Sequence, residues 1–243
     1  IRDRSLSGIH VVNIDLTTTP TAQLVIIKKK LSGGIMLTAS HNPKNWNALK
    51  FFNDKGEFLS EHDVKEILDV ESNNLTPQIN NIDFGKIHDL KDSFKLHIDE
   101  ILNLKHVNPQ KIREKKFKIV VDGINSSGGI VIPMLLEILN VEVIKINCVP
   151  DGNFAHDPEP LDKNLSELKK EVLVHNADLG IAVDPDVDRL VFVSEMGETL
   201  GEENTLISCA DYILSKENGP AVSNLSSSMG LRDICTEYNV KYF

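Results

Sequence analysis

The sequence predicts an α/β protein made of consecutive domains. Short apolar runs of strand character alternate with amphipathic helical segments along the whole chain, which is the pattern of α/β folds. The chain has 243 residues, of which 41% are hydrophobic, enough for more than one packed core. A second series of strand and helix patterns begins at Asn108-Pro109. We therefore expect domains at residues 1–107 and 108–216, followed by the incomplete start of a third at 217–243.

The first expected domain is punctuated by turn residues. Thr18-Thr19-Pro20-Thr21 offers capping residues for a following helix, and Asn42-Pro43 ends an extended run because proline cannot continue a strand ladder. Asn53-Asp54-Lys55-Gly56 is typical of a tight turn between strands. The expected strands cover 9–16, 35–37 and 49–52, and the expected helices cover 22–31, 60–68 and 93–104.

The second expected domain opens with a β-α-β unit. A strand at 117–121 runs into the glycine- and serine-rich loop 122–129, which fits neither of the common phosphate-binding glycine patterns. We therefore favour a structural strand-to-helix turn there over a phosphate cradle. The later elements are a helix at 130–139, a strand at 141–146, a helix at 165–174, strands at 177–183 and 190–193, a helix at 201–214, and in the third unit a strand at 221–224 and a helix at 231–238.

Composition excludes several classes of protein. The 36 acidic and 26 basic residues give a net charge of −10, which argues against nucleic-acid binding. Cys148, Cys209 and Cys235 are widely spaced and odd in number, so they indicate a reducing compartment and neither a disulfide framework nor a zinc site. The most apolar stretch, 128–144, is interrupted by proline and acidic residues and cannot span a membrane. We expect a cytoplasmic protein without a membrane partner.

The two ends of the chain are unusual. It begins at Ile1 without methionine and stops at Phe243 within what reads as an unfinished unit. We expect a fragment, or a chain with segments missing. The sequence does not determine the oligomeric state.

One candidate for chemistry is the stretch from Gly33 to Pro43. Its apolar centre predicts a buried strand, and Ser40 follows where that strand stops, a frequent location of catalytic side chains in α/β proteins. His41 comes next, and Lys50 lies just beyond the turn. A lone serine in a loop is more often a hydrogen-bonding turn residue than a catalytic one. The residues around Ser40 therefore have to distinguish between the two roles.

The second candidate is Asp184-Pro185-Asp186-Val187-Asp188-Arg189, directly after a predicted strand. Three carboxylates at alternate positions of a tight turn repel one another unless a hard cation neutralises them, and oxygen-only ligands favour magnesium over zinc. An EF-hand loop is excluded because Arg189 occupies the position that requires glycine. An aspartyl phosphatase with Asp184 as nucleophile and a solvated acidic turn remain as alternatives.

Both stretches carry a resemblance to a known family. Thr38-Ala39-Ser40-His41-Asn42-Pro43, with Asn47 and Lys50 after it, resembles the phosphoserine loop of the α-D-phosphohexomutases, which include phosphoglucomutases, phosphomannomutases and phosphoglucosamine mutases. Residues 184–189 resemble the metal loop of that family, with Pro185 in place of a glycine. Residues 2–8 resemble its early arginine motif, with Ser5 in place of an arginine.

The resemblance implies a fold of mixed sheets flanked by helices, comprising the first two domains and the start of a third. It also implies an intramolecular phosphotransferase that interconverts hexose 1-phosphates and 6-phosphates through a phosphoserine at Ser40 and a hexose 1,6-bisphosphate. By the same resemblance, Mg²⁺ is held by Ser40, Asp184, Asp186 and Asp188. A glucose 1,6-bisphosphate-type activator supplies the phosphoryl group.

Three further residues receive roles from the resemblance. Arg189 and Lys50 would bind substrate and stabilise charge on the transferring phosphoryl group. Lys50 is our choice for proton transfer and His41 for phosphate contact, although either could act as the general base. Phosphoglucomutase or phosphomannomutase activity is expected first, with phosphoglucosamine mutase as the alternative within the family. A metal-dependent aspartyl phosphatase and a non-catalytic remnant that binds a sugar phosphate are the alternatives from other classes.

Overall fold

The computed structural model describes residues 8–72, 84–225 and 227–243. The chain divides into two compact units. The first unit comprises Ile1–Thr38 and Asn47–Asp99, and the second comprises Ala39–Trp46 and Glu100–Phe243. Residues 2–7 of the arginine motif lie outside the described residues.

The first unit contains two small sheets. Strand β1 (Val11–Asn13) pairs in parallel with β4 (Ile87–Asp89), and β2 (Gly34–Leu37) pairs antiparallel with β3 (Leu49–Phe52). Its helices are α2 (Thr19–Lys29), α3 (Glu61–Ser72) and the first part of α4 (Ser93–Leu102).

Helix α2 begins and ends where its sequence dictates. The Thr18 hydroxyl accepts a hydrogen bond from the backbone N–H of Thr21, and Pro20 stands in the first turn, where its missing N–H costs nothing. Lys30 ends the helix in the left-handed conformation, with φ of 52°. Ala22 and Ile26 on α2 pack with Phe52 of β3 as a small buried core.

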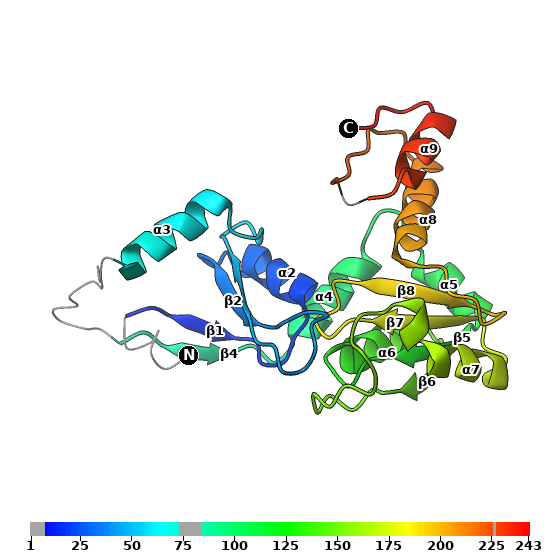
Figure 1. The fold of residues 1–243 in the computed structure, drawn as a ribbon, viewed down its shortest axis with the longest axis horizontal. Coiled ribbons are helices and arrows are strands. Elements are labelled where there is room, and N and C mark those ends of the chain that lie inside the picture. Colours follow the sequence, from blue (N-terminus) through cyan, green and yellow to red (C-terminus); the bar gives the residue numbers. More distant parts are fainter. Residues whose placement is uncertain (1–7, 73–83, 226) are drawn as a thin grey trace. The chain divides into compact units, whose positions relative to one another are not determined.

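The second unit is built on one four-stranded mixed sheet (Figure 1). The strand order is β6 (Glu142–Ile146), β5 (Lys118–Asp122), β7 (Leu179–Val183) and β8 (Leu190–Ser194). The pairs β6–β5 and β5–β7 are parallel, and β8 runs antiparallel to β7. The helices of this unit are α5 (Pro109–Lys115), α6 (Gly128–Ile138), α7 (Ser166–His175), α8 (Glu202–Leu214) and α9 (Gly230–Glu237), and a short 3₁₀ helix covers Asp162–Asn164.

Side chains along each strand point alternately to the two faces of this sheet, and helices cover both faces. Val120 and Val193 point to one face, where they pack with Leu168 and Val172 of α7. The neighbouring strand residues point to the other face and pack against α6, in a cluster that contains Ile119, Val121, Ile181, Val183, Leu136 and Leu139. The second unit is therefore a three-layer α/β/α domain.

The observed elements confirm the predicted α/β class with mixed sheets and helices, but several details were wrong or missed. The strand before Ser40 is not buried as predicted, since Ile35 and Leu37 of β2 are 45% and 74% exposed. Helix α5 was missed, although Asn108 caps it by accepting from the backbone N–H of Lys111, and strand β4 was missed as well. Residues 221–224 form no strand, since Ala221 makes only an isolated bridge with Tyr242. None of the helices in the described part of the chain has the length and apolar character that a membrane crossing requires.

Candidate active site

The Ser40 loop belongs to the compact second unit although it follows strand β2 of the first unit. The Asn42 backbone N–H and side-chain amide both donate to the Ala39 carbonyl, at 3.0 and 2.8 Å, and so tighten the turn. Ser40 adopts φ of 49°, in the left-handed region that non-glycine residues rarely occupy. The loop therefore holds the Ser40 side chain in an orientation that the local sequence does not favour.

The acidic loop follows β7, at the carboxyl edge of the sheet. Asp184 and Asp186 are buried, with exposed fractions of 0% and 2%. One carboxylate oxygen from each of Asp184, Asp186 and Asp188 lies within 4.8 Å of the others. Both loop-closing bonds go to Asp184 Oδ1, which accepts from the backbone N–H groups of Asp188 and Arg189 at 3.0 Å each.

These three carboxylates fit a hard divalent cation. Burial first, and then the neighbouring charges of Asp186 and Asp188, raise the pKa of Asp184 to about 7, against the hydrogen bonds from Arg189 and Ser40, which lower it. Such a cluster is costly when it is fully ionised and alone, and a cation with oxygen ligands removes that cost. Asp184, Asp186 and Asp188 could therefore hold Mg²⁺.

The glycine- and serine-rich loop between β5 and α6 supports the acidic loop. The hydroxyls of Ser126 and Ser127 both donate to the Pro185 carbonyl, at 2.7 and 2.8 Å. Ser127 is buried. This geometry supports the predicted structural role of loop 122–129. It also shows two residues of the site whose function the sequence alone did not reveal.

Ser40 lies directly against the acidic loop. Its hydroxyl donates to Asp184 Oδ2 at 2.9 Å. His41 Nδ1 lies 3.3 Å from Ser40 Oγ, and an Arg189 guanidinium nitrogen lies 3.3 Å from His41 Nε2. Because arginine can only donate, His41 Nε2 accepts and the neutral ring carries its proton on Nδ1. The hydrogen bonds then run in one direction, from Arg189 through His41 and Ser40 to Asp184.

The second unit thus brings together six of the seven residues that the sequence singled out, namely Ser40, His41, Asp184, Asp186, Asp188 and Arg189. Lys50 lies on β3 of the first unit. Its ammonium donates to the Thr19 hydroxyl at 3.2 Å and lies 5.7 Å from the centre of the Phe58 ring. These contacts fix the end of a long side chain that would otherwise sample many rotamers.

The sequence analysis also missed Glu159. Its carboxylate accepts from Arg189 Nη1 at 2.9 Å. The residue lies in the polar, proline-rich loop before the 3₁₀ helix, 30 positions away from its partner. A charged residue in a loop carries little signal by itself, and only the fold shows what it contacts.

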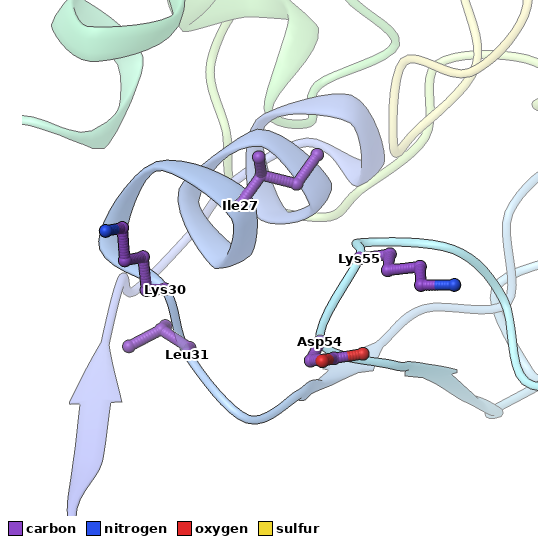
Figure 2. A pocket seen from close by; sticks show the side chains of 5 residues that line it. All are labelled: Ile27, Lys30, Leu31, Asp54 and Lys55. Atoms are coloured by element: carbon purple, nitrogen blue, oxygen red, sulfur yellow. The ribbon is translucent and has the colours of Figure 1, made fainter.

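A separate hollow exists in the first unit, at the end of α2 (Figure 2). It has a volume of about 430 Å³ and is lined by Ile27, Lys30, Leu31, Asp54 and Lys55. None of the predicted site residues lines it. It is a shallow surface feature, and it contributes nothing to the candidate site.

Comparison with known proteins agrees with this geometry. Residues 5–76 match the family model described as phosphoglucomutase/phosphomannomutase, alpha/beta/alpha domain I, and residues 95–197 match the corresponding domain II. A relative named probable phosphoglucosamine mutase, from Methanopyrus kandleri, is 34% identical over 232 residues. The match covers 95% of this chain and 50% of the relative, so the chain spans about half the length of the curated relatives it matches.

Solved structures share the fold. A putative phosphomannomutase from Thermus thermophilus superimposes with a TM-score of 0.84 at 22% identity, covering 98% of this chain and 54% of that one. A more distant match, with a TM-score of 0.51 and 16% identity, is N-acetylphosphoglucosamine mutase from Aspergillus fumigatus in complex with GlcNAc-6P and magnesium; it covers 93% of this chain and 59% of that one. The same family is indicated by the two consecutive domain models, by the motifs around Ser40 and Asp184, and by the fold. The chain therefore belongs to the α-D-phosphohexomutase family.

Proposed function

We propose that this chain carries the phosphoserine and metal loops of a phosphohexomutase that interconverts hexose 1-phosphates and 6-phosphates. The observation that carries the proposal is the hydrogen bond of 2.9 Å from Ser40 Oγ to Asp184, within a cluster of three carboxylates, of which Asp184 and Asp186 are buried and Asp188 is exposed. Phosphoryl transfer depends on positioning and charge neutralisation more than on covalent chemistry, and this arrangement offers both.

Each residue has a task that its contacts support. Ser40 carries the phosphoryl group, donates it to a hydroxyl of the hexose monophosphate, and accepts back the other phosphoryl group from the resulting bisphosphate. Mg²⁺, held by Asp184, Asp186, Asp188 and a Ser40 oxygen, would supply Lewis-acid neutralisation of phosphoryl charge when bound. His41 lies 3.3 Å from Ser40 Oγ and Arg189 lies 3.3 Å from the other ring nitrogen of His41, and both would contact phosphoryl oxygens. Lys50, once it is the neutral amine, would accept the proton of the attacking sugar hydroxyl.

Several finer assignments belong to the same proposal. The M. kandleri relative is named for phosphoglucosamine, so glucosamine phosphate is the first substrate to assay, beside glucose and mannose phosphates. A glucose 1,6-bisphosphate-type activator would load Ser40. We retain the domain limits 1–107, 108–216 and 217–243, and the cytoplasmic location.

The rival aspartyl-phosphatase mechanism requires Asp184 to attack phosphorus. In the structure both oxygens of Asp184 already accept hydrogen bonds, Oδ1 from two backbone N–H groups and Oδ2 from Ser40. The two bonds to Oδ1 occupy its lone pairs, so only Oδ2 could attack phosphorus, and the Ser40 hydroxyl lies against that oxygen at 2.9 Å. We therefore propose Ser40 as the residue that is phosphorylated.

The test is mass spectrometry of the Ser40 peptide. The complete gene product is incubated with Mg²⁺ and glucose 1,6-bisphosphate, with Ser40→Ala as control. We expect phosphate on Ser40 and none elsewhere in the control, and mutase turnover that the substitution abolishes. Phosphate on Asp184 would establish the phosphatase mechanism. No phosphate on either residue, together with no turnover, would indicate a binding remnant.

A further inference from the structure

We propose that Glu159 is a positioning residue for Arg189, and that an ion pair between His156 and Asp122 anchors the loop that carries Glu159. The inference rests on the proposed function, because it assigns to Arg189 a role at the phosphoryl group on Ser40. It adds residues from a loop that neither signature motif of the family contains.

The contact between Glu159 and Arg189 fixes one side of the guanidinium. Arg189 Nη1 donates to Glu159 Oε1 at 2.9 Å, while Nη2 lies 3.3 Å from His41 Nε2. The nearest Glu202 oxygen is farther, 3.9 Å from Arg189 Nε. A planar guanidinium held at two corners keeps one orientation, whereas a free arginine side chain samples many rotamers. Glu159 therefore holds the guanidinium in the orientation in which it contacts His41, the neighbour of Ser40.

Glu159 can do this only if its own loop is fixed. The loop is closed on one side by the Asn164 side-chain amide, which donates to the Glu159 carbonyl at 2.7 Å. On the other side, His156 Nε2 lies 3.0 Å from Asp122 Oδ2, and His156 Nδ1 lies 2.8 Å from the Asp157 carbonyl oxygen. The backbone on both sides of Glu159 is thus tied to the body of the second unit.

The protonation state of His156 follows from these partners. Both ring nitrogens face an oxygen that can only accept when Asp122 is ionised, so both must donate, which makes the ring an imidazolium. Asp122 is 1% exposed and also accepts from the Ile124 N–H and the Asn147 amide, and Glu167 lies behind Asn147. Acidic and amide groups surround the ring, and no described hydrogen bond or ion pair joins it to a cation.

The anchor stands at the edge of the sheet that carries the acidic loop. Asp122 is the last residue of β5, and its neighbour β7 runs parallel to β5 and ends at Val183, directly before Asp184. A rigid sheet therefore positions both the carboxylates and, through His156 and Glu159, the arginine beside them.

The experiment compares Glu159→Gln with Glu195→Gln, which removes an exposed carboxylate after β8, in the complete gene product. Glu159→Gln preserves size and an acceptor oxygen but removes the charge. We expect kcat to fall about 10- to 100-fold with KM little changed, because the arginine acts on the transferring group. Glu195→Gln should behave like the wild type. Glu159→Asp, which keeps the charge, should restore part of the loss.

A second readout does not depend on turnover. The ¹⁵N NMR signals of the Arg189 guanidinium, assigned with Arg189→Lys, should show restricted rotation in the wild type and free rotation in Glu159→Gln. His156→Ala should loosen them likewise, and His156→Gln, which can still donate to Asp122, should preserve them in part. Unchanged signals and unchanged kcat in Glu159→Gln would overturn the positioning role. A wild type with restricted Arg189 but no mutase turnover would overturn the proposed function and leave the positioning intact.

Discussion

At the scale of single residues, the two loops of the site share backbone conformations that their sequences do not favour. Ser40 has φ of 49° and Val187, between Asp186 and Asp188, has φ of 60°. A β-branched residue is an outlier in the left-handed region, at a cost of about 1–3 kcal/mol. Such strain persists where the surrounding structure imposes it, and here it directs Ser40 and the carboxylates toward one point.

The raised pKa of Asp184 predicts how the stability of the protein depends on pH and on Mg²⁺. The folded pKa of about 7 stands above the unfolded value of 3.8, so between these values the folded state binds the extra proton. Without metal, stability should therefore fall as pH rises from about 4 to 7. Mg²⁺ competes with that proton, so it should raise the Tm more at pH 8 than at pH 5, as measured by differential scanning fluorimetry.

Asp184→Asn is the matched variant for this measurement. This substitution should reduce the change of Tm with pH in the absence of metal. It should also weaken the rise of Tm on addition of Mg²⁺. A wild type whose Tm rises equally with Mg²⁺ at both pH values would contradict the assignment of Asp184 as a ligand.

At the scale of elements, the site depends on the contact of two loops at one edge of the sheet. The turn between β5 and α6 is close-packed, since a Cβ added at Gly129 would lie 2.6 Å from the Cys148 Cα. That packing places Ser126 and Ser127 where their hydroxyls reach the Pro185 carbonyl. The proline that replaces the family's glycine keeps its carbonyl oxygen, so the replacement leaves this contact available.

The double substitution Ser126→Ala/Ser127→Ala tests this support. Each lost hydrogen bond is worth about 1 kcal/mol, and the acidic loop should hold its carboxylates less firmly. We expect Mg²⁺ affinity, measured by isothermal titration calorimetry, to fall about 5- to 20-fold. Ser208→Ala removes a similar hydroxyl-to-carbonyl bond, to Asn204 at an exposed position of α8, and should leave the affinity unchanged. If the double variant bound Mg²⁺ as tightly as Ser208→Ala, the two serines would not position the acidic loop.

At the scale of the whole molecule, the two units have separate cores. Ala22, Ile26 and Phe52 form the core of the first unit. In the described part of the second unit, two clusters lie one on each face of the sheet, and a third contains Leu214, Leu231 and Cys235. Because no buried cluster of the described residues combines both units, each unit should unfold with its own transition.

Two core truncations should move these transitions independently. Ile26→Ala in the first unit and Leu168→Ala in the second each remove a buried side chain, 3% and 0% exposed, and should cost about 2–5 kcal/mol in the affected unit alone. Leu173→Ala, on the same helix as Leu168 but 52% exposed, should change stability by less than about 0.5 kcal/mol. Differential scanning calorimetry measures both transitions. A single transition that shifts in both core variants would contradict independent cores.

The sequence by itself determined the α/β class, most helices and strands, and the two loops with the candidate chemistry. These were predictable because their signals are local: a hydrophobic period, a cap, or carboxylates at alternate positions. Helix α5 was not predicted because its seven residues, rich in lysine and arginine, show no clear hydrophobic period. Residues 221–224 were wrongly predicted as a strand because two adjacent apolar residues do not reveal whether a neighbouring strand is present to pair with them.

Only the tertiary structure decided which distant residues meet at the site. The hydrogen bond from Ser40 to Asp184 joins positions 144 apart, and the pairs Glu159–Arg189 and His156–Asp122 join positions 30 and 34 apart. Each of these groups is an ordinary polar residue in its own segment. Their chemistry arises when parallel strands end at one edge of a sheet and bury charges that must then find partners.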